Sequence, residues 1–151
     1  MAISTDPDYR YQALHAFQSQ REGYRLALHL QAEYGKWLIA TIAGIHLAAI
    51  YLVISNDSLP PSAKINGTGV FAAGIMNILF AGLFALWNSR LLARLYGEWS
   101  DARILVDPEA WPKEDPFLTR RIEESFNAAV MFGAISAALI FVGTVVVISS
   151  L

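Results

Sequence analysis

Three long runs without a charged residue constrain this chain more than any other feature of its sequence. Between Lys36 and Asp57 lie 20 residues without Asp, Glu, Lys or Arg, between Lys64 and Arg90 lie 25, and 27 follow Glu124. An α-helix of about 20 residues covers the roughly 30 Å hydrocarbon core of a bilayer. The expected fold class is therefore all-α, an integral membrane protein with three transmembrane helices and cytoplasmic helical extensions.

The predicted organisation is a single membrane domain over residues 1–151. It comprises a cytoplasmic amphipathic helical arm (1–36), span one (37–56), an outer loop (57–67), span two (68–89), a cytoplasmic helical extension with a Pro-containing loop (90–124) and span three (125–150). A soluble fold is disfavoured because 55% of the residues are hydrophobic and only 16% are charged. That leaves too little polar chain to surround three such helices.

The distribution of basic residues predicts the orientation of the chain in the membrane. Four of the 11 Lys and Arg residues lie in the arm and six between Arg90 and Arg121, whereas the outer loop holds only Lys64. The positive-inside rule then predicts a cytoplasmic N-terminus and an external C-terminus, and we expect a bacterial inner membrane. Trp37 and Trp87 stand at the inner ends of spans one and two, where indole rings favour the headgroup level and act as interface anchors.

The arm carries apolar residues at helical spacing. Leu14, Phe17, Tyr24 and Leu28 recur at steps of three, seven and four, with charged residues between them. One helix could run through into span one, or the chain could bend at Gly35. The arm could lie flat on the headgroups, or it could dock a cytosolic protein or a neighbouring copy.

Three prolines mark the connection between spans two and three. Pro108, Pro112 and Pro116 follow one another at four-residue intervals, a spacing that stops a helix and favours an extended connector. Asp115 and Pro116 suit the cap and the first position of the next helix.

Three polar residues fall at the middle of the predicted spans. With each span centred in the bilayer, His46, Asn77 and Ser136 lie at one depth. Unpaired polar groups are costly in hydrocarbon, so we expect these three to bond one another or another subunit. They are interpreted as helix-joining contacts or, alternatively, as the lining of a proton or ion path. A haem held by His46 of two neighbouring chains is the one conceivable cofactor site, although we expect no cofactor.

Small residues spaced four apart indicate faces where helices could approach closely, within or between chains. They are Gly44 and Ala48 in span one, Gly69 and Ala73 in span two, and Ala129, Gly133 and Ala137 in span three.

Catalysis and nucleic-acid binding find no support in the sequence. The chain has no cysteine, a net charge of -2, and none of the HExxH, GxxxxGK[ST], GxSxG or GxGxxG motifs. We therefore expect a small non-enzymatic membrane protein that meets the lipid bilayer, self-associates or joins a partner membrane subunit, and docks a cytosolic protein through its cytoplasmic helices. No catalytic or metal site is expected. The alternative is an oligomeric channel or membrane-permeabilising effector lined by His46 and Asn77.

Overall fold

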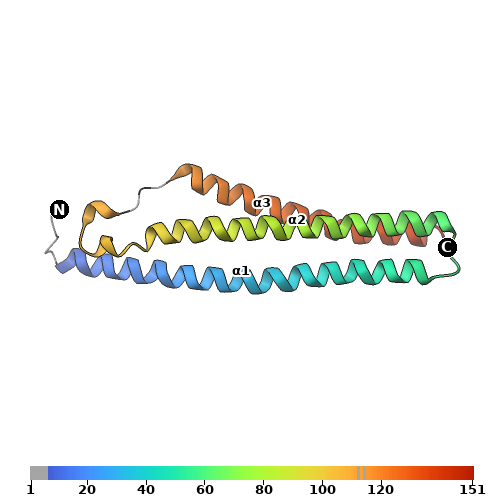
Figure 1. The fold of residues 1–151 in the computed structure, drawn as a ribbon, viewed down its shortest axis with the longest axis horizontal. Coiled ribbons are helices and arrows are strands. Elements are labelled where there is room, and N and C mark those ends of the chain that lie inside the picture. The colour runs from blue at the N-terminus through green and yellow to red at the C-terminus, as the bar shows by residue number, and fades with distance from the viewer. Residues whose placement is uncertain (1–6, 112, 114) are drawn as a thin grey trace.

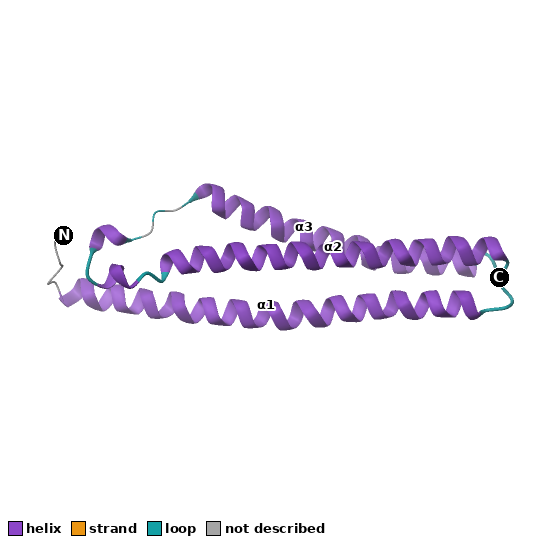
Figure 2. Cartoon of the chain, viewed as in Figure 1, coloured by secondary structure: helices purple, strands orange, loops and turns teal. Residues whose placement is uncertain are grey.

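The computed structural model describes residues 7–111, 113 and 115–151. Its elements are three long helices, α1 (Pro7–Ser55), α2 (Pro61–Trp99) and α3 (Pro116–Ile148), with two short 3-10 turns, η1 (Ala102–Leu105) and η2 (Pro108–Ala110), between α2 and α3. The described residues contain no strand (Figure 2). Each helix runs opposite to the one before it, so the start of α1 and the C-terminus lie at opposite ends of an elongated bundle (Figure 1).

Helix α1 joins the predicted arm and span one without a break. Its 49 residues make it about 74 Å long at 1.5 Å per residue. Proline occurs in it only as Pro7, in the first turn, where the missing N–H costs no helical hydrogen bond. The helix continues through Gly35, which answers the question that the sequence left open. Residues 1–6 of the arm lie outside the described part of the chain.

Helix α2 begins earlier than the sequence suggested. Pro60 has an extended backbone (φ -66°, ψ 152°) and Pro61 takes the first helical position. Residues 61–67, expected in the outer loop, are therefore helical, because proline suits the first turn of a helix. The connection between α1 and α2 is reduced to residues 56–60, where the Leu59 amide donates to the carbonyl of Asn56 at 3.3 Å.

Residues 100–115 are called the connector below. Its described part includes the turn η2 at Pro108–Ala110, where the prolines predict an extended segment. Asp101 and Asp107 each accept a hydrogen bond from the backbone amide two residues on and so begin η1 and η2. The hydroxyl of Tyr9 donates to the carbonyl of Ile104 at 2.6 Å and accepts from Trp111 Nε1 at 3.0 Å. Side-chain hydrogen bonds to local amides favour such turns over extended chain. Pro112 lies outside the described residues.

The predicted start of α3 is confirmed. The carboxylate of Asp115 accepts hydrogen bonds from the amides of Phe117 at 3.0 Å and Leu118 at 3.2 Å, and Pro116 holds the first helical position. These bonds satisfy two amides that the helix itself leaves without partners.

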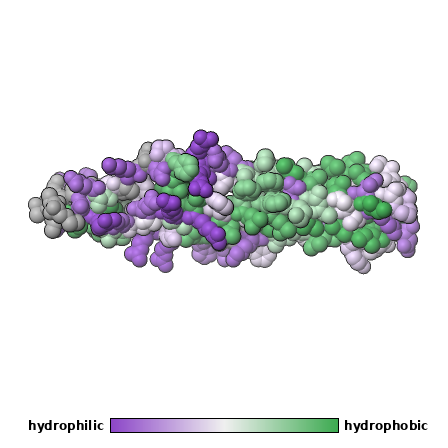
Figure 3. All heavy atoms as spheres, turned by 45° about the horizontal axis from the view of Figure 1, so that its top comes forward, coloured by the Kyte–Doolittle hydropathy of each residue, from purple (hydrophilic) through white to green (hydrophobic). Residues whose placement is uncertain are grey.

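The bundle divides along its length into two halves of opposite character (Figure 3). The apolar half (residues 37–89 and 125–148) exposes large hydrophobic side chains such as Trp37, Leu52 and Phe141. Only 11% of the most apolar stretch of α1, 22% of that of α2 and 11% of that of α3 is buried within the chain. The charged half (residues 7–36 and 90–124) carries most of the charged side chains. All three helices are long and apolar enough to span a membrane.

Helix α2 is the central helix of the bundle, because α1 and α3 both pack along it and barely touch each other. Four of its buried residues recur every seven positions: Gly67, Gly74, Ala81 and Asn88. A seven-residue repeat of buried positions is the signature of helices that cross at about +20°.

Helix α1 meets α2 through large side chains placed over glycines. Val53 lies against Gly67, His46 against Gly74, and Ile39 against Gly82, which is the order expected of antiparallel helices. The three α1 residues are again seven apart. Each glycine removes the side chain that would otherwise hold the backbones apart.

Candidate functional site

The innermost polar group of the apolar half is a hydrogen-bonded set of three residues, one from each helix, called the His46 cluster. His46 and Ser136 are both 0% exposed. His46 Nε2 lies 3.1 Å from both Oγ and the carbonyl oxygen of Ser136. The Ser136 hydroxyl lies 2.8 Å from the carbonyl oxygen of Gly74 and donates to it. The cluster therefore ties α1, α2 and α3 together at one level.

These distances assign the hydrogens of the cluster. Ser136 has one hydroxyl hydrogen, which goes to Gly74, so its oxygen and carbonyl can only accept from His46. The neutral imidazole must then carry its hydrogen on Nε2 and leave Nδ1 as an acceptor. Nδ1 is buried and has no partner among the described residues. His46 therefore donates from Nε2 to Ser136, and its side chain has no direct contact with solvent.

Two glycines make room for the rings of His46 and Phe71 at the centre of the apolar half. A Cβ added at Gly74 would overlap the imidazole of His46. Phe71 lies 6.0 Å from the imidazole, centroid to centroid, and its own ring covers Gly143, where an added Cβ would come within 2.6 Å. Side chains therefore fill the centre of the apolar half in a single chain, as close packing in protein interiors requires.

Asn77 does not join His46 and Ser136 within the chain, which leaves a bond to another subunit as the expected alternative that stays a prediction. It lies three residues from Gly74, hence about 4.5 Å from it along the axis. Its amide Nδ2 donates to the carbonyl of Ala73 in its own helix at 2.8 Å. Asn77 is not among the buried residues of α2, and its half-buried side chain lies at the edge of the bundle. Its carbonyl oxygen accepts no hydrogen bond from the described residues.

Asn88 and Ser125 form a second polar contact, which the sequence analysis missed. Asn88 is 4% exposed, and its Nδ2 donates to the carbonyl of Ile122 at 2.7 Å and to Ser125 Oγ at 3.0 Å. The sequence does hold a sign that Asn88 is buried, because Asn88 follows Gly74 by two seven-residue repeats. This sign can be recognised only once the buried residues of α2 are known to recur every seven positions.

The small residues singled out from the sequence are not the ones that bring the helices together within this chain. A Cβ added at Gly44, Gly69 or Gly133 would have nothing within 4 Å. Ala48 and Ala73 are exposed, and Ala129 and Ala137 are half-buried. The close approaches occur instead at Gly67, Gly74, Gly82 and Gly143. Packing between chains through the predicted positions stays a prediction.

The two tryptophans expected at the membrane boundary both lie on the outside of the bundle. Trp37 is 74% exposed and Trp87 is 53% exposed. The guanidinium of Arg121 lies 5.8 Å from the Trp87 ring and 5.4 Å from the Phe117 ring, within the range of cation–π attraction. Trp87 therefore sits where the apolar half meets the basic residues of α3.

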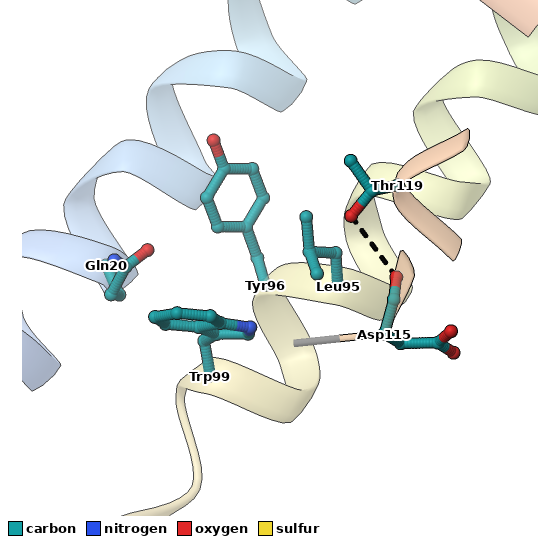
Figure 4. A pocket seen from close by; sticks show the side chains of 6 residues that line it. All are labelled: Gln20, Leu95, Tyr96, Trp99, Asp115 and Thr119. Atoms are coloured by element: carbon teal, nitrogen blue, oxygen red, sulfur yellow. Dashed lines mark hydrogen bonds between the residues drawn. The ribbon is translucent and has the colours of Figure 1, made fainter. Parts of the chain in front are cut away.

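A cleft opens at the charged end between all three helices (Figure 4). Its volume is about 290 Å³, and Gln20 of α1, Tyr96 and Trp99 of α2 and Thr119 of α3 line it. The Tyr96 ring also meets Tyr24 edge to face at 6.0 Å. The carboxylate of Asp115 points away from Tyr96 and Trp99 in this view. The cleft thus offers aromatic faces and an amide.

We compared the described residues with the ligand sets that a metal ion or a haem requires. Among the residues that the structure describes, no three His, Asp or Glu side chains gather as metal ligands. His46 cannot reach a haem between two copies, because its own chain covers it on all sides. No protein family, no curated protein and no solved structure matches the chain.

Proposed function

We propose that this chain is a non-enzymatic membrane protein that self-associates within the bilayer and serves as a scaffold on the cytoplasmic side. In this proposal the apolar half crosses a bacterial inner membrane three times, and the charged half projects into the cytoplasm. The outward-facing apolar side chains and the length of the three helices support membrane insertion. Ten of the 11 basic residues lie at the charged end and only Lys64 at the other, which supports the orientation.

Asn77 is the observation that carries self-association. In a bilayer its carbonyl oxygen and one amide hydrogen would lie near the midplane with neither water nor protein to bond them. An unsatisfied polar group in hydrocarbon costs several kcal/mol. Two copies related by an axis along the membrane normal place their Asn77 residues at equal depth, so each amide can donate to the other's carbonyl. The exposed Gly69 and Ala73 on the same helix allow close approach beside it.

The charged half supports the scaffold role. About 28 residues of α1 precede Gly35, which makes an extension of about 42 Å. Tyr11 and Leu26 on this extension are 72% and 61% exposed. The Tyr96 and Trp99 faces of the cleft suit a partner segment that inserts an apolar side chain and bonds the amide of Gln20. We propose the cleft as the place where such a cytosolic segment docks.

An oligomeric channel is the second candidate, and less supports it. His46 and Ser136 are enclosed by their own chain, so a path between copies would have Asn77 as its only midplane polar residue from the predicted set. Ion flux from liposomes that carry the protein would favour this candidate over the scaffold.

Fluorescence energy transfer between labelled copies in vesicles tests self-association. We expect the parent chain to associate as its density in the membrane rises. Replacing Asn77 by Leu should weaken association about 3- to 30-fold, the effect of losing about 0.6–2 kcal/mol of interhelical hydrogen bonding. Thr144→Val is the matched control, because the Thr144 hydroxyl is exposed and already donates to Ile140 of its own helix at 2.8 Å. A parent chain that stays monomeric at every density would refute the proposal.

A further inference from the structure

A lateral groove between α1 and α3 lies where the apolar half meets the charged half. Its volume is about 470 Å³, and its lining is mostly apolar. Gly82 and Ala85 of α2 form part of its lining, together with Ile39 of α1 and Phe126 and Ala129 of α3. The groove exists because α1 and α3 both pack along α2 and make few contacts with each other. The short side chains of α2 leave it open.

The groove runs from the predicted headgroup level into the predicted hydrocarbon. Towards the charged half it is lined by Leu28 of the arm, by Lys36, the last charged residue before span one, and by Ser89, which precedes Arg90. At the other end Ile39 touches Gly82, inside the apolar half. A groove in this position has a polar entrance and an apolar interior.

Lys36 supplies an exposed cation at the entrance. Its side chain forms no ion pair or hydrogen bond with the described residues. Basic pockets between transmembrane helices on the cytoplasmic side are favourable sites for anionic headgroups. An apolar groove that opens sideways into a bilayer must be filled by something apolar, because dispersion contacts are lost in an empty space.

We propose that the lateral groove binds an anionic phospholipid of the inner leaflet, with one acyl chain against Gly82 and Ala85 and the phosphate at Lys36. A helix from another protein is a poorer occupant. One turn of a helix 10–12 Å wide fills about 420–610 Å³, so the volume of the groove matches a single helical turn. A flexible acyl chain is thinner than a helix and can follow the whole length of the groove. The inference rests on the proposed insertion into a membrane and is independent of self-association.

Native mass spectrometry of the full chain in detergent micelles tests the site. The micelles contain equal amounts of dioleoyl phosphatidylglycerol and dioleoyl phosphatidylcholine, and the retained lipids are counted. We expect about fivefold more phosphatidylglycerol than phosphatidylcholine on the parent chain, the effect of one lysine at an anionic surface. Lys36→Gln should abolish the preference and keep a bound lipid. Lys64→Gln, at the opposite end of the bundle, should preserve the preference.

A second variant fills the groove without changing charge. Ala129→Leu places a larger side chain in it and should lower retention of both lipids severalfold, whereas Ala134→Leu on the exposed face of α3 should not. Asn77→Leu should retain lipid like the parent chain, which separates this proposal from self-association. Equal retention of both lipids by the parent chain, or an Ala129→Leu variant that is folded by circular dichroism and retains lipid normally, would overturn the inference.

Discussion

Replacing Gly74 by alanine tests whether the His46 cluster holds the bundle together. The added methyl would overlap the imidazole, and the imidazole cannot move aside because Nε2 is bonded to Ser136 at 3.1 Å. Helices α1 and α2 must therefore separate. Gly44→Ala is the matched control, because it lies two residues from His46 and its added methyl meets nothing within 4 Å.

The expected loss of stability has two parts. Overpacking a filled core costs about 1–3 kcal/mol. Loss of the interhelical hydrogen bond of His46 costs about 0.6–2 kcal/mol more. Alanine also gains up to about 1 kcal/mol of helix propensity over glycine, but this gain is the same in both variants and cancels. The free energy of unfolding of Gly74→Ala should therefore lie about 2–5 kcal/mol below that of Gly44→Ala.

Unfolding in mixed micelles with rising SDS, followed by tryptophan fluorescence, measures this difference. Adding His46→Ala to Gly74→Ala removes the overlap and should recover part of the lost stability, as a double-mutant cycle detects. Two glycine variants of equal stability, or a double variant no more stable than Gly74→Ala, would show that the ring does not press on this glycine.

Three further changes probe individual contacts. Ser136→Ala removes one acceptor of His46 and should lower the free energy of unfolding by about 1 kcal/mol in the same SDS titration, whereas Thr144→Ala should change it little because its bond is local and exposed. Asp115→Ala removes the α3 cap at a cost of about 1 kcal/mol, and hydrogen exchange should accelerate only in the first turn of α3. Tyr9→Phe removes the two hydrogen bonds that the Tyr9 hydroxyl makes to the connector, so hydrogen exchange at Ile104 and its neighbours should rise severalfold while the apolar half is unchanged. An unchanged exchange rate there would contradict the anchoring of the connector by Tyr9.

The helices were predictable because their signals are local. Charge-free length located the apolar parts of all three, and Asp115 with Pro116 located the start of α3. The start of α2 was misplaced, because Pro60 and Pro61 suggest a loop equally well and only the structure shows that Pro61 opens a helix. Proline is compatible with both positions.

Which residues face the core was much less predictable. In a water-soluble helix the polar face marks the outside, but both the core and the expected surroundings of the apolar half are apolar, so hydropathy does not distinguish them. The four-residue spacing pointed to Gly44 and Gly69, whereas the structure uses the seven-residue repeat that contains Gly67 and Gly74. Asn77 lies outside this repeat and bonds its own helix, whereas His46 packs on Gly74, which belongs to the repeat.

Cysteine accessibility tests most directly the claim that the apolar half lies in a membrane with its two ends on opposite sides. The chain has no cysteine, so single substitutions at Ser19 in the charged half, Ser150 near the C-terminus and Ser136 in the core report on three positions without background. In intact cells a membrane-impermeant maleimide should label position 150 alone, position 19 only after the membrane is opened, and position 136 only after the protein is unfolded. Labelling of positions 19 and 150 from the same side, or recovery of the chain in the soluble fraction without detergent, would contradict the account.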